Sequence, residues 1–128
     1  MNENDKNLLI SAARAARANA YAPYSNYKVG AAILAKSGKI YTGANFENAA
    51  FGAGTCAERV ALGAALAAGE REFTAVACVG AEESITPCGI CRQALAEFGE
   101  MTVICAGADD DGLRVYKLSE LLPFGFSL

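Results

Sequence analysis

The sequence predicts an α/β fold of three layers, α/β/α, with a mixed five-stranded sheet whose last two strands run antiparallel. Near-continuous apolar runs at 73–80 and 102–108 indicate strands that are covered on both faces. The stretch 109–112 is too short to hold a crossover helix, so the segment after it is expected to return antiparallel. At 128 residues, the chain is expected to form a single domain over 1–128.

The first half of the chain is predicted to form a helix followed by a hairpin. Residues 3–19 are dominated by leucine, isoleucine and alanine, which favour a helix. Small and branched apolar residues indicate strands at 28–36 and 39–45. Ser37 and Gly38 lie between these two runs and supply a tight turn, so the two strands are expected to pair.

The second half is predicted to alternate helices with the two covered strands. A helix begins at Thr55, a favourable N-cap residue, and ends near Gly69. After the first covered strand, a loop at 81–87 leads into a helix at 88–98. The last strand is expected at 113–118, followed by one short helical turn. The resulting order is α-β-β-α-β-α-β-β.

Composition and charge exclude several classes of function. The net charge is −3, and no run of lysine or arginine could neutralise phosphates, so nucleic acid is disfavoured as a partner. No segment approaches the roughly 18 uninterrupted apolar residues of a membrane span. The acidic first residues differ from a secretory signal, and an odd number of cysteines, five, argues against a disulfide framework. We therefore expect a soluble cytoplasmic domain with reduced thiols.

Three cysteines and one glutamate carry the strongest chemical signal. Cys56 and Cys88 each fall in the first turn of a predicted helix, where free N–H groups favour the thiolate. Cys91 follows Cys88 at helical spacing and shares its face. A catalytic zinc ion takes three protein ligands and leaves one position to water. Because the chain contains no histidine, the pattern predicts a zinc site of three sulfurs, with Glu58 close enough to move protons.

Simpler interpretations of the same residues stay open at this point. Glu58 also fits a capping box, and helix spacing alone favours that role. A Cys-x-x-Cys pair by itself is more often redox-active or part of a structural metal site. Cys78 and Cys105 lie inside apolar strands and are interpreted as small core residues. Arg59 could donate hydrogen bonds to the sulfurs, whereas Arg92 is interpreted as an ordinary solvated helix residue.

Two motifs together resemble a known enzyme family. The segments Cys56-Ala57-Glu58-Arg59 and Pro87-Cys88-Gly89-Ile90-Cys91-Arg92-Gln93 are similar to the homotetrameric cytidine deaminases, a branch of the zinc deaminases. The similarity runs from Tyr21 to about Phe126 and also includes 21–32 and 43–49. Any single piece is weakly informative, but the combination is highly specific.

The resemblance implies a reaction and a set of residues that perform it. The reaction is the hydrolytic deamination of cytidine and 2′-deoxycytidine to uridine and 2′-deoxyuridine, with release of ammonia, in pyrimidine salvage. Cys56, Cys88 and Cys91 would hold one Zn²⁺ per subunit, and Glu58 would shuttle protons. Arg59 would offset part of the charge of the thiolates. The substrate is a small nucleoside, and the assembly a homotetramer.

The resemblance also implies how the substrate is held. Asn45 and Glu47 match the ribose-binding pair of the family, whose amide and carboxylate bind the sugar hydroxyl. Ala57 would contribute backbone groups to the base. Tyr27 and Phe126 match positions at which the family places aromatic rings around the pyrimidine.

Two positions and three rival functions complete the expectations. Phe51 falls where the family often has an aromatic residue near a neighbouring subunit's site, and Phe124 competes with Phe126 as the ring that closes the pocket.

A blasticidin-S deaminase-like aminohydrolase is disfavoured because that family lacks the Asn-x-Glu-Asn run. A non-catalytic zinc-stabilised module would keep the cysteines without needing Glu58. An enzyme acting on polynucleotides is disfavoured by the net charge.

Overall fold

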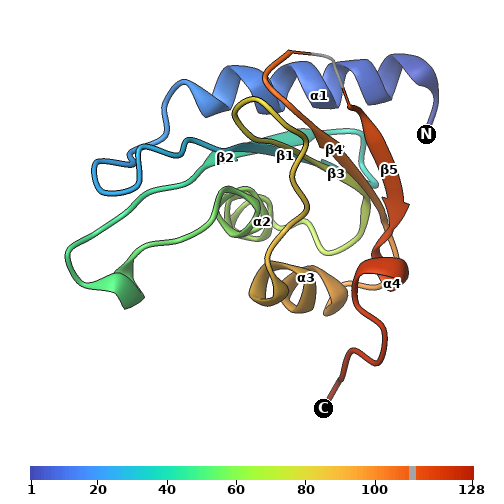
Figure 1. Cartoon of the computed structure of the whole chain (residues 1–128). Helices are drawn as coiled ribbons and strands as arrows, with labels where there is room; N and C mark the ends of the chain where they lie inside the picture. Colours follow the sequence, from blue (N-terminus) through green and yellow to red (C-terminus); the bar gives the residue numbers. More distant parts are fainter. Residues whose placement is uncertain (110–111) are drawn as a thin grey trace.

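A mixed five-stranded sheet forms the centre of the computed structural model, which describes residues 1–109 and 112–128. The strand order is β2-β1-β3-β4-β5. Helix α1 covers one face, and α2 and α3 cover the other (Figure 1). The predicted three-layer architecture is therefore confirmed. Within the described ranges, no helix is both long enough and apolar enough to span a membrane.

The helices and strands lie where the sequence predicts them, with shorter ends. Their bounds are α1 (Glu3–Arg17), β1 (Gly30–Ala35), β2 (Ile40–Ala44), α2 (Ala57–Ala67), β3 (Phe73–Val79), α3 (Gly89–Ala96), β4 (Thr102–Ala106), β5 (Arg114–Lys117) and α4 (Leu118–Leu121), with a 3₁₀ turn at Phe51–Ala53. The expected N-cap is wrong by one residue, because Cys56 rather than Thr55 caps α2. The turn expected at 109–112 includes residues 110 and 111, which lie outside the described residues.

The directions of the strands bring two helix starts to one edge of the sheet. Strand β1 is antiparallel to both β2 and β3, so β2 and β3 point the same way. Strands β3 and β4 are parallel and are joined by the crossover helix α3, and β5 returns antiparallel to β4 as predicted. Because α2 follows the loop after β2 and α3 follows the loop after β3, both helices begin at the edge where these strands end.

Close packing holds α2 directly against the edge strand β2. A Cβ atom added at Gly43 would lie 2.4 Å from the backbone nitrogen of Ala61 and 2.5 Å from the carbonyl oxygen of Ala57. Only glycine permits this approach of strand to helix. The layer between α2, α3 and the sheet is filled by buried side chains that include Leu62, Val76, Leu95 and Val103. The first turn of α2 is thereby fixed in position.

Candidate active site

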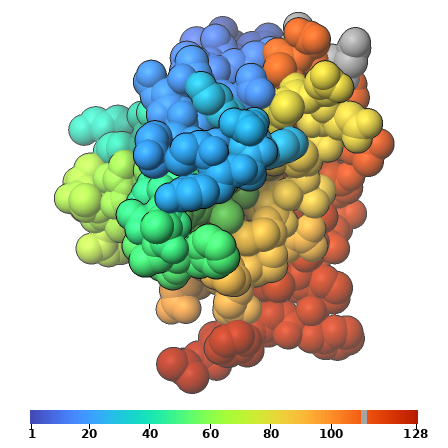
Figure 2. Space-filling model, turned by 60° about the vertical axis from the view of Figure 1, so that its left-hand side comes forward, coloured from blue at the N-terminus to red at the C-terminus, as the bar shows by residue number. Residues whose placement is uncertain are grey.

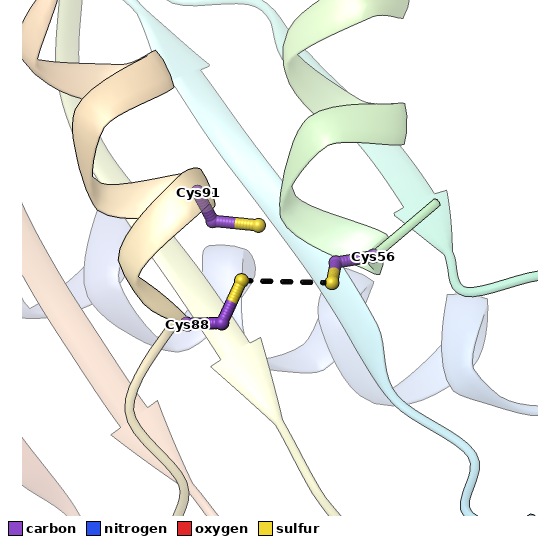
Figure 3. Close-up of side chains that lie close together, drawn as sticks. All are labelled: Cys56, Cys88 and Cys91. Carbon is purple, nitrogen blue, oxygen red and sulfur yellow. Dashed lines mark hydrogen bonds between the residues drawn. The ribbon is translucent and has the colours of Figure 1, made fainter. Parts of the chain in front are cut away.

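The side chains of Cys56, Cys88 and Cys91 converge between the starts of α2 and α3 (Figure 3). Their three Sγ atoms all lie within 4.8 Å of one another. The Sγ atoms of Cys56 and Cys88 are 3.8 Å apart. A tetrahedral zinc ion with Zn–S bonds of about 2.3 Å separates its sulfur ligands by about 3.8 Å. The donor set and its spacing therefore fit a zinc ion with three thiolate ligands.

The local structure of each cysteine follows from its place in a helix start. Cys56 is the N-cap of α2 and Cys88 the N-cap of α3, and neither side chain caps its helix by a hydrogen bond. The sulfurs are thus available to a ligand. Burial opposes ionisation of Cys88, but the backbone N–H groups of Cys91 and Ile90 help to lower the pKa of its thiol. Burial raises the pKa of the fully buried Cys91 thiol, so a cation is needed to hold it as a thiolate.

Glu58 is a buried carboxyl group in the first turn of α2, with only 4% of its surface exposed. Burial raises the pKa of Glu58 above its usual value, while its backbone N–H group, Arg59 and the thiol of Cys91 oppose the shift. The capping-box interpretation finds no support, because the N-cap residue Cys56 makes no side-chain cap hydrogen bond. A buried carboxyl group with a raised pKa, next to the thiol of Cys91, is suited to hold and release a proton.

Arg59 reaches back from α2 to the sulfurs. Its Nη2 lies 3.7 Å from Cys56 Sγ, within hydrogen-bonding distance of sulfur. The pKa of the guanidinium is raised chiefly by Cys91 and then by Cys56, so the group stays charged beside the thiolates. A fixed positive charge at this position offsets part of the negative charge of three thiolates.

A cavity of about 360 Å³ extends from Cys56 and Arg59 to the polar side chains of Asn45 and Glu47. The segments around residues 25 and 50 lie side by side over this region, next to the start of α3 (Figure 2). Phe51 lines the cavity but is 89% exposed. The cavity thus joins Cys56, one of the three cysteines, to the hydrogen-bonding groups of Asn45 and Glu47.

The side chains of Asn45 and Glu47 in this cavity are held by the chain between residues 24 and 29. Glu47 accepts hydrogen bonds from the backbone N–H groups of Tyr24 and Ser25 and from the Ser25 hydroxyl. The Ser25 hydroxyl is the main reason that the pKa of Glu47 lies below its usual value. Asn45 accepts a bond from the backbone of Val29 at 2.8 Å and donates one to the carbonyl of Tyr27 at 2.9 Å. Each side chain keeps spare capacity for a ligand.

The aromatic residues expected around the base do not line this cavity within one chain. Tyr27 is 41% exposed and places its hydroxyl against Gly80, at the end of β3. Phe126 is 68% exposed, and its backbone is held by the side chain of Gln93 through two hydrogen bonds. Phe124 is fully exposed. The C-terminal segment extends away from the body of the molecule (Figures 1 and 2).

Sequence reasoning missed two residues that support the site. The hydroxyl of Ser25 donates a hydrogen bond to Glu47 and orients it. The serine itself gives no signal in the sequence, and only its place in the segment 21–32 could have pointed to it. The interpretation of Arg92 as an ordinary solvated residue is wrong, because its guanidinium makes three hydrogen bonds to protein oxygens. Cys78 and Cys105 are buried, as predicted, and their Sγ atoms lie 3.7 Å apart on the neighbouring strands β3 and β4.

Comparison with known proteins places this arrangement in a family. Residues 3–107 match the model of the cytidine and deoxycytidylate deaminase zinc-binding region. The chain is 42% identical to a cytidine deaminase of Halalkalibacterium halodurans, over 96% of this chain and 95% of the relative. It is 44% identical to a cytidine deaminase of Sporosarcina psychrophila, over 96% and 92% of the two chains.

Solved structures show the same similarity in three dimensions. A crystal structure of cytidine deaminase from Burkholderia pseudomallei has a TM-score of 0.89 and 46% identity, and the match covers 98% of this chain and 100% of that one. A crystal structure of cytidine deaminase from Mycobacterium tuberculosis has a TM-score of 0.80 and 38% identity, over 97% and 98% of the two chains.

Proposed function

The chain belongs to the cytidine and deoxycytidylate deaminase family and is a zinc-dependent enzyme that deaminates cytidine, and we propose which of its residues carry out the reaction. The observation that supports the assignment best is the cluster of three Sγ atoms within 4.8 Å of one another, with the buried carboxyl group of Glu58 next to Cys91 and a cavity that reaches Cys56. Cys56, Cys88 and Cys91 hold the ion. A bound zinc ion supplies a nucleophile by lowering the pKa of a water molecule to about 7.

Glu58 moves the protons of the reaction. It accepts a proton from the attacking water and delivers it to ring N3, which makes C4 a better electrophile. The oxygen adds at C4, so the N3=C4 double bond becomes a single bond and the carbon becomes tetrahedral. Glu58 then takes the remaining proton from the hydroxyl group at C4 and gives it to the amino group. The C4–N bond breaks to release ammonia as the C4=O double bond of uridine forms. Its burial supports this role, since burial raises the pKa of the carboxyl group above its usual value and makes the protonated form easier to reach.

Asn45 and Glu47 bind the sugar. The carboxylate of Glu47 is held by the loop at 21–27 and accepts a hydrogen bond from a sugar hydroxyl. One such contact does not require a 2′-hydroxyl, so we expect 2′-deoxycytidine to be a substrate as well. An ionised carboxylate at this position repels a phosphate, which favours free nucleosides over nucleotides. The backbone of Ala57 contacts the base. The family resemblance also supports a position of the ring of Tyr27 near the base, although this ring does not line the cavity of a single chain.

We further propose that one domain over 1–128 assembles into a homotetramer. The exposed rings of Phe51, Phe124 and Phe126 support this proposal, because large apolar side chains gather at interfaces. In the assembly, Phe51 and Phe126 lie near the sites of neighbouring subunits. Three cysteines must stay reduced to bind zinc, which agrees with a role in the cytoplasm, in pyrimidine salvage.

The substitution Glu58→Gln tests the assignment. The amide keeps the size of the side chain but cannot accept and release the proton, so kcat should fall by at least about 100-fold. Metal analysis should still find one zinc ion per chain, and the ultraviolet change on adding cytidine measures turnover. Glu70→Gln, at the far end of α2, is the matched control. Zinc binding with no turnover in the wild-type chain would instead indicate a non-catalytic zinc module.

A further inference from the structure

We propose that Arg92 is a positioning residue of the metal centre, whose side chain fixes the backbone directly before Cys88 so that the sulfur of Cys88 stays within reach of the other ligands. The inference rests on the zinc site of the proposed function. It assigns to Arg92 a role in metal affinity without any contact between its side chain and the substrate.

Cys88 is the ligand that packing holds least. Cys91 is fully buried, and its position is set by the core. Cys56 follows Thr55, whose backbone makes two hydrogen bonds with Phe46, of 3.0 and 3.1 Å. Cys88, by contrast, is exposed and follows a segment, 80–87, that forms no helix or strand, although Pro87 directly before it is buried. A contact that fixes the backbone at Pro87 would therefore help to hold the sulfur of Cys88 in place.

Arg92 makes that contact from within α3. Its Nε–H group donates a hydrogen bond of 2.7 Å to the carbonyl oxygen of Pro87. Its own backbone N–H group donates one of 3.0 Å to the carbonyl oxygen of Cys88. The guanidinium thus binds the carbonyl before Cys88, whereas the carbonyl of Cys88 itself is held by the backbone hydrogen bond of the helix, which any residue at position 92 would make. Because these two peptide units define the φ and ψ of Cys88, which are −67° and 167°, their anchoring directs the side chain.

Two further bonds keep the guanidinium itself from moving. Its Nη1 donates to the carbonyl oxygen of Leu121, at the end of α4, at 2.7 Å. Its Nη2 donates to the hydroxyl of Thr86 at 3.0 Å. The donors of a guanidinium are arranged in a rigid planar fork, so all three oxygens are bound in one geometry. A lysine ammonium is a point charge and cannot reproduce this arrangement.

Two substitutions of Arg92 test the inference through metal binding. Arg92→Met removes the guanidinium, and Arg92→Lys keeps the charge but not the fork. Competition with a chromophoric chelator measures the zinc affinity of each variant, which should be lower than that of the wild type by about tenfold or more. In the cobalt-substituted protein, the thiolate-to-cobalt absorption band should also shift, because one sulfur has moved.

Arg71→Met is the matched control. Arg71 likewise donates to two backbone carbonyls, those of Leu66 at 3.0 Å and Glu70 at 2.8 Å, but at the opposite end of α2 from the metal centre. Its removal should leave zinc affinity and the cobalt spectrum unchanged. An equal loss of affinity in this variant would overturn the inference, since it would reflect general destabilisation.

The remaining outcomes also decide the matter. Wild-type zinc affinity in Arg92→Met would overturn the inference, and so would wild-type affinity in Arg92→Lys, because charge alone would then suffice. If Arg92→Met does not fold, Arg92→Lys decides the question by itself. A wild-type chain that binds no zinc would overturn the ligand assignment of the proposed function, and this inference with it. Normal wild-type binding with unaffected Arg92 variants would overturn this inference alone.

Discussion

At the scale of single residues, the polar groups of the site are oriented before any substrate arrives. Glu47 receives three hydrogen bonds from Tyr24 and Ser25, and Asn45 is held through both ends of its amide. A side chain that is already fixed loses little conformational freedom on binding a ligand. Asn45 and Glu47, the proposed sugar-binding pair, are therefore held in place by the chain between residues 24 and 29 rather than left as two free side chains.

The substitution Ser25→Ala should weaken substrate binding with little effect on the chemical step. Without the hydroxyl, Glu47 loses one of its anchors, so KM for cytidine should rise about fivefold to tenfold while kcat changes little. Ser37→Ala is the control, because Ser37 makes the same kind of bond to the carboxylate of Glu70, away from the cavity. Equal KM values in the two variants would contradict a role for Ser25.

The same variant should change the dependence of KM on pH. The Ser25 hydroxyl is the main cause of the lowered pKa of Glu47, so the wild-type carboxylate stays ionised until the pH falls through that lowered value. In Ser25→Ala the pKa rises towards its ordinary value. The increase of KM on acidification should therefore begin at a higher pH in the variant, as steady-state kinetics across the acidic range would reveal.

At the scale of elements, the position of α2 on β2 determines where Cys56 and Glu58 lie. Both residues belong to the start of α2, and the helix can approach the strand only because Gly43 has no side chain. The second helix start, that of α3, reaches the same edge through the parallel pairing of β3 and β4. The site is thus a consequence of strand direction combined with one close contact.

Two glycine substitutions should change stability in opposite directions. In Gly43→Ala the added methyl group would meet the backbone of α2, so the free energy of unfolding should fall by about 1–3 kcal/mol. In Gly63→Ala the new methyl group has nothing within 4 Å, and alanine favours a helix, so the free energy of unfolding should rise by about 1 kcal/mol. Urea unfolding of the zinc-loaded proteins measures both. If both substitutions changed the free energy of unfolding by the same amount, the close contact between Gly43 and α2 would not be important for stability.

At the scale of the whole molecule, the C-terminal segment 124–128 packs poorly against the rest of a single chain. Phe124 and Leu128 are fully exposed and Phe126 is 68% exposed, while Gln93 holds the backbone of Phe126. Exposed aromatic rings held on a defined backbone are typical of surfaces that meet another chain. This observation supports the proposed assembly, in which the segment completes a neighbouring site.

Deletion of residues 124–128 should separate stability from substrate binding. Because these residues bury little surface in one chain, the free energy of unfolding should stay nearly unchanged. If the segment closes a neighbouring pocket, KM for cytidine should rise severalfold, and light scattering should report whether the assembly persists. Phe124→Ala and Phe126→Ala, made singly, identify which ring is responsible. Unchanged kinetics in the deletion would remove the segment from the site.

The sequence by itself determined the order of the elements and the chemistry of the site. Continuous apolar runs predict buried strands, and because the chain has no histidine, cysteine and carboxylate side chains are left as zinc ligands. Only the tertiary structure decided which contacts support that chemistry. Cys56 and Cys88 are 32 positions apart and meet because two helices begin at one sheet edge. The hydrogen bond of Arg92 to Leu121 likewise depends on the path of the chain, which residue type and periodicity do not encode.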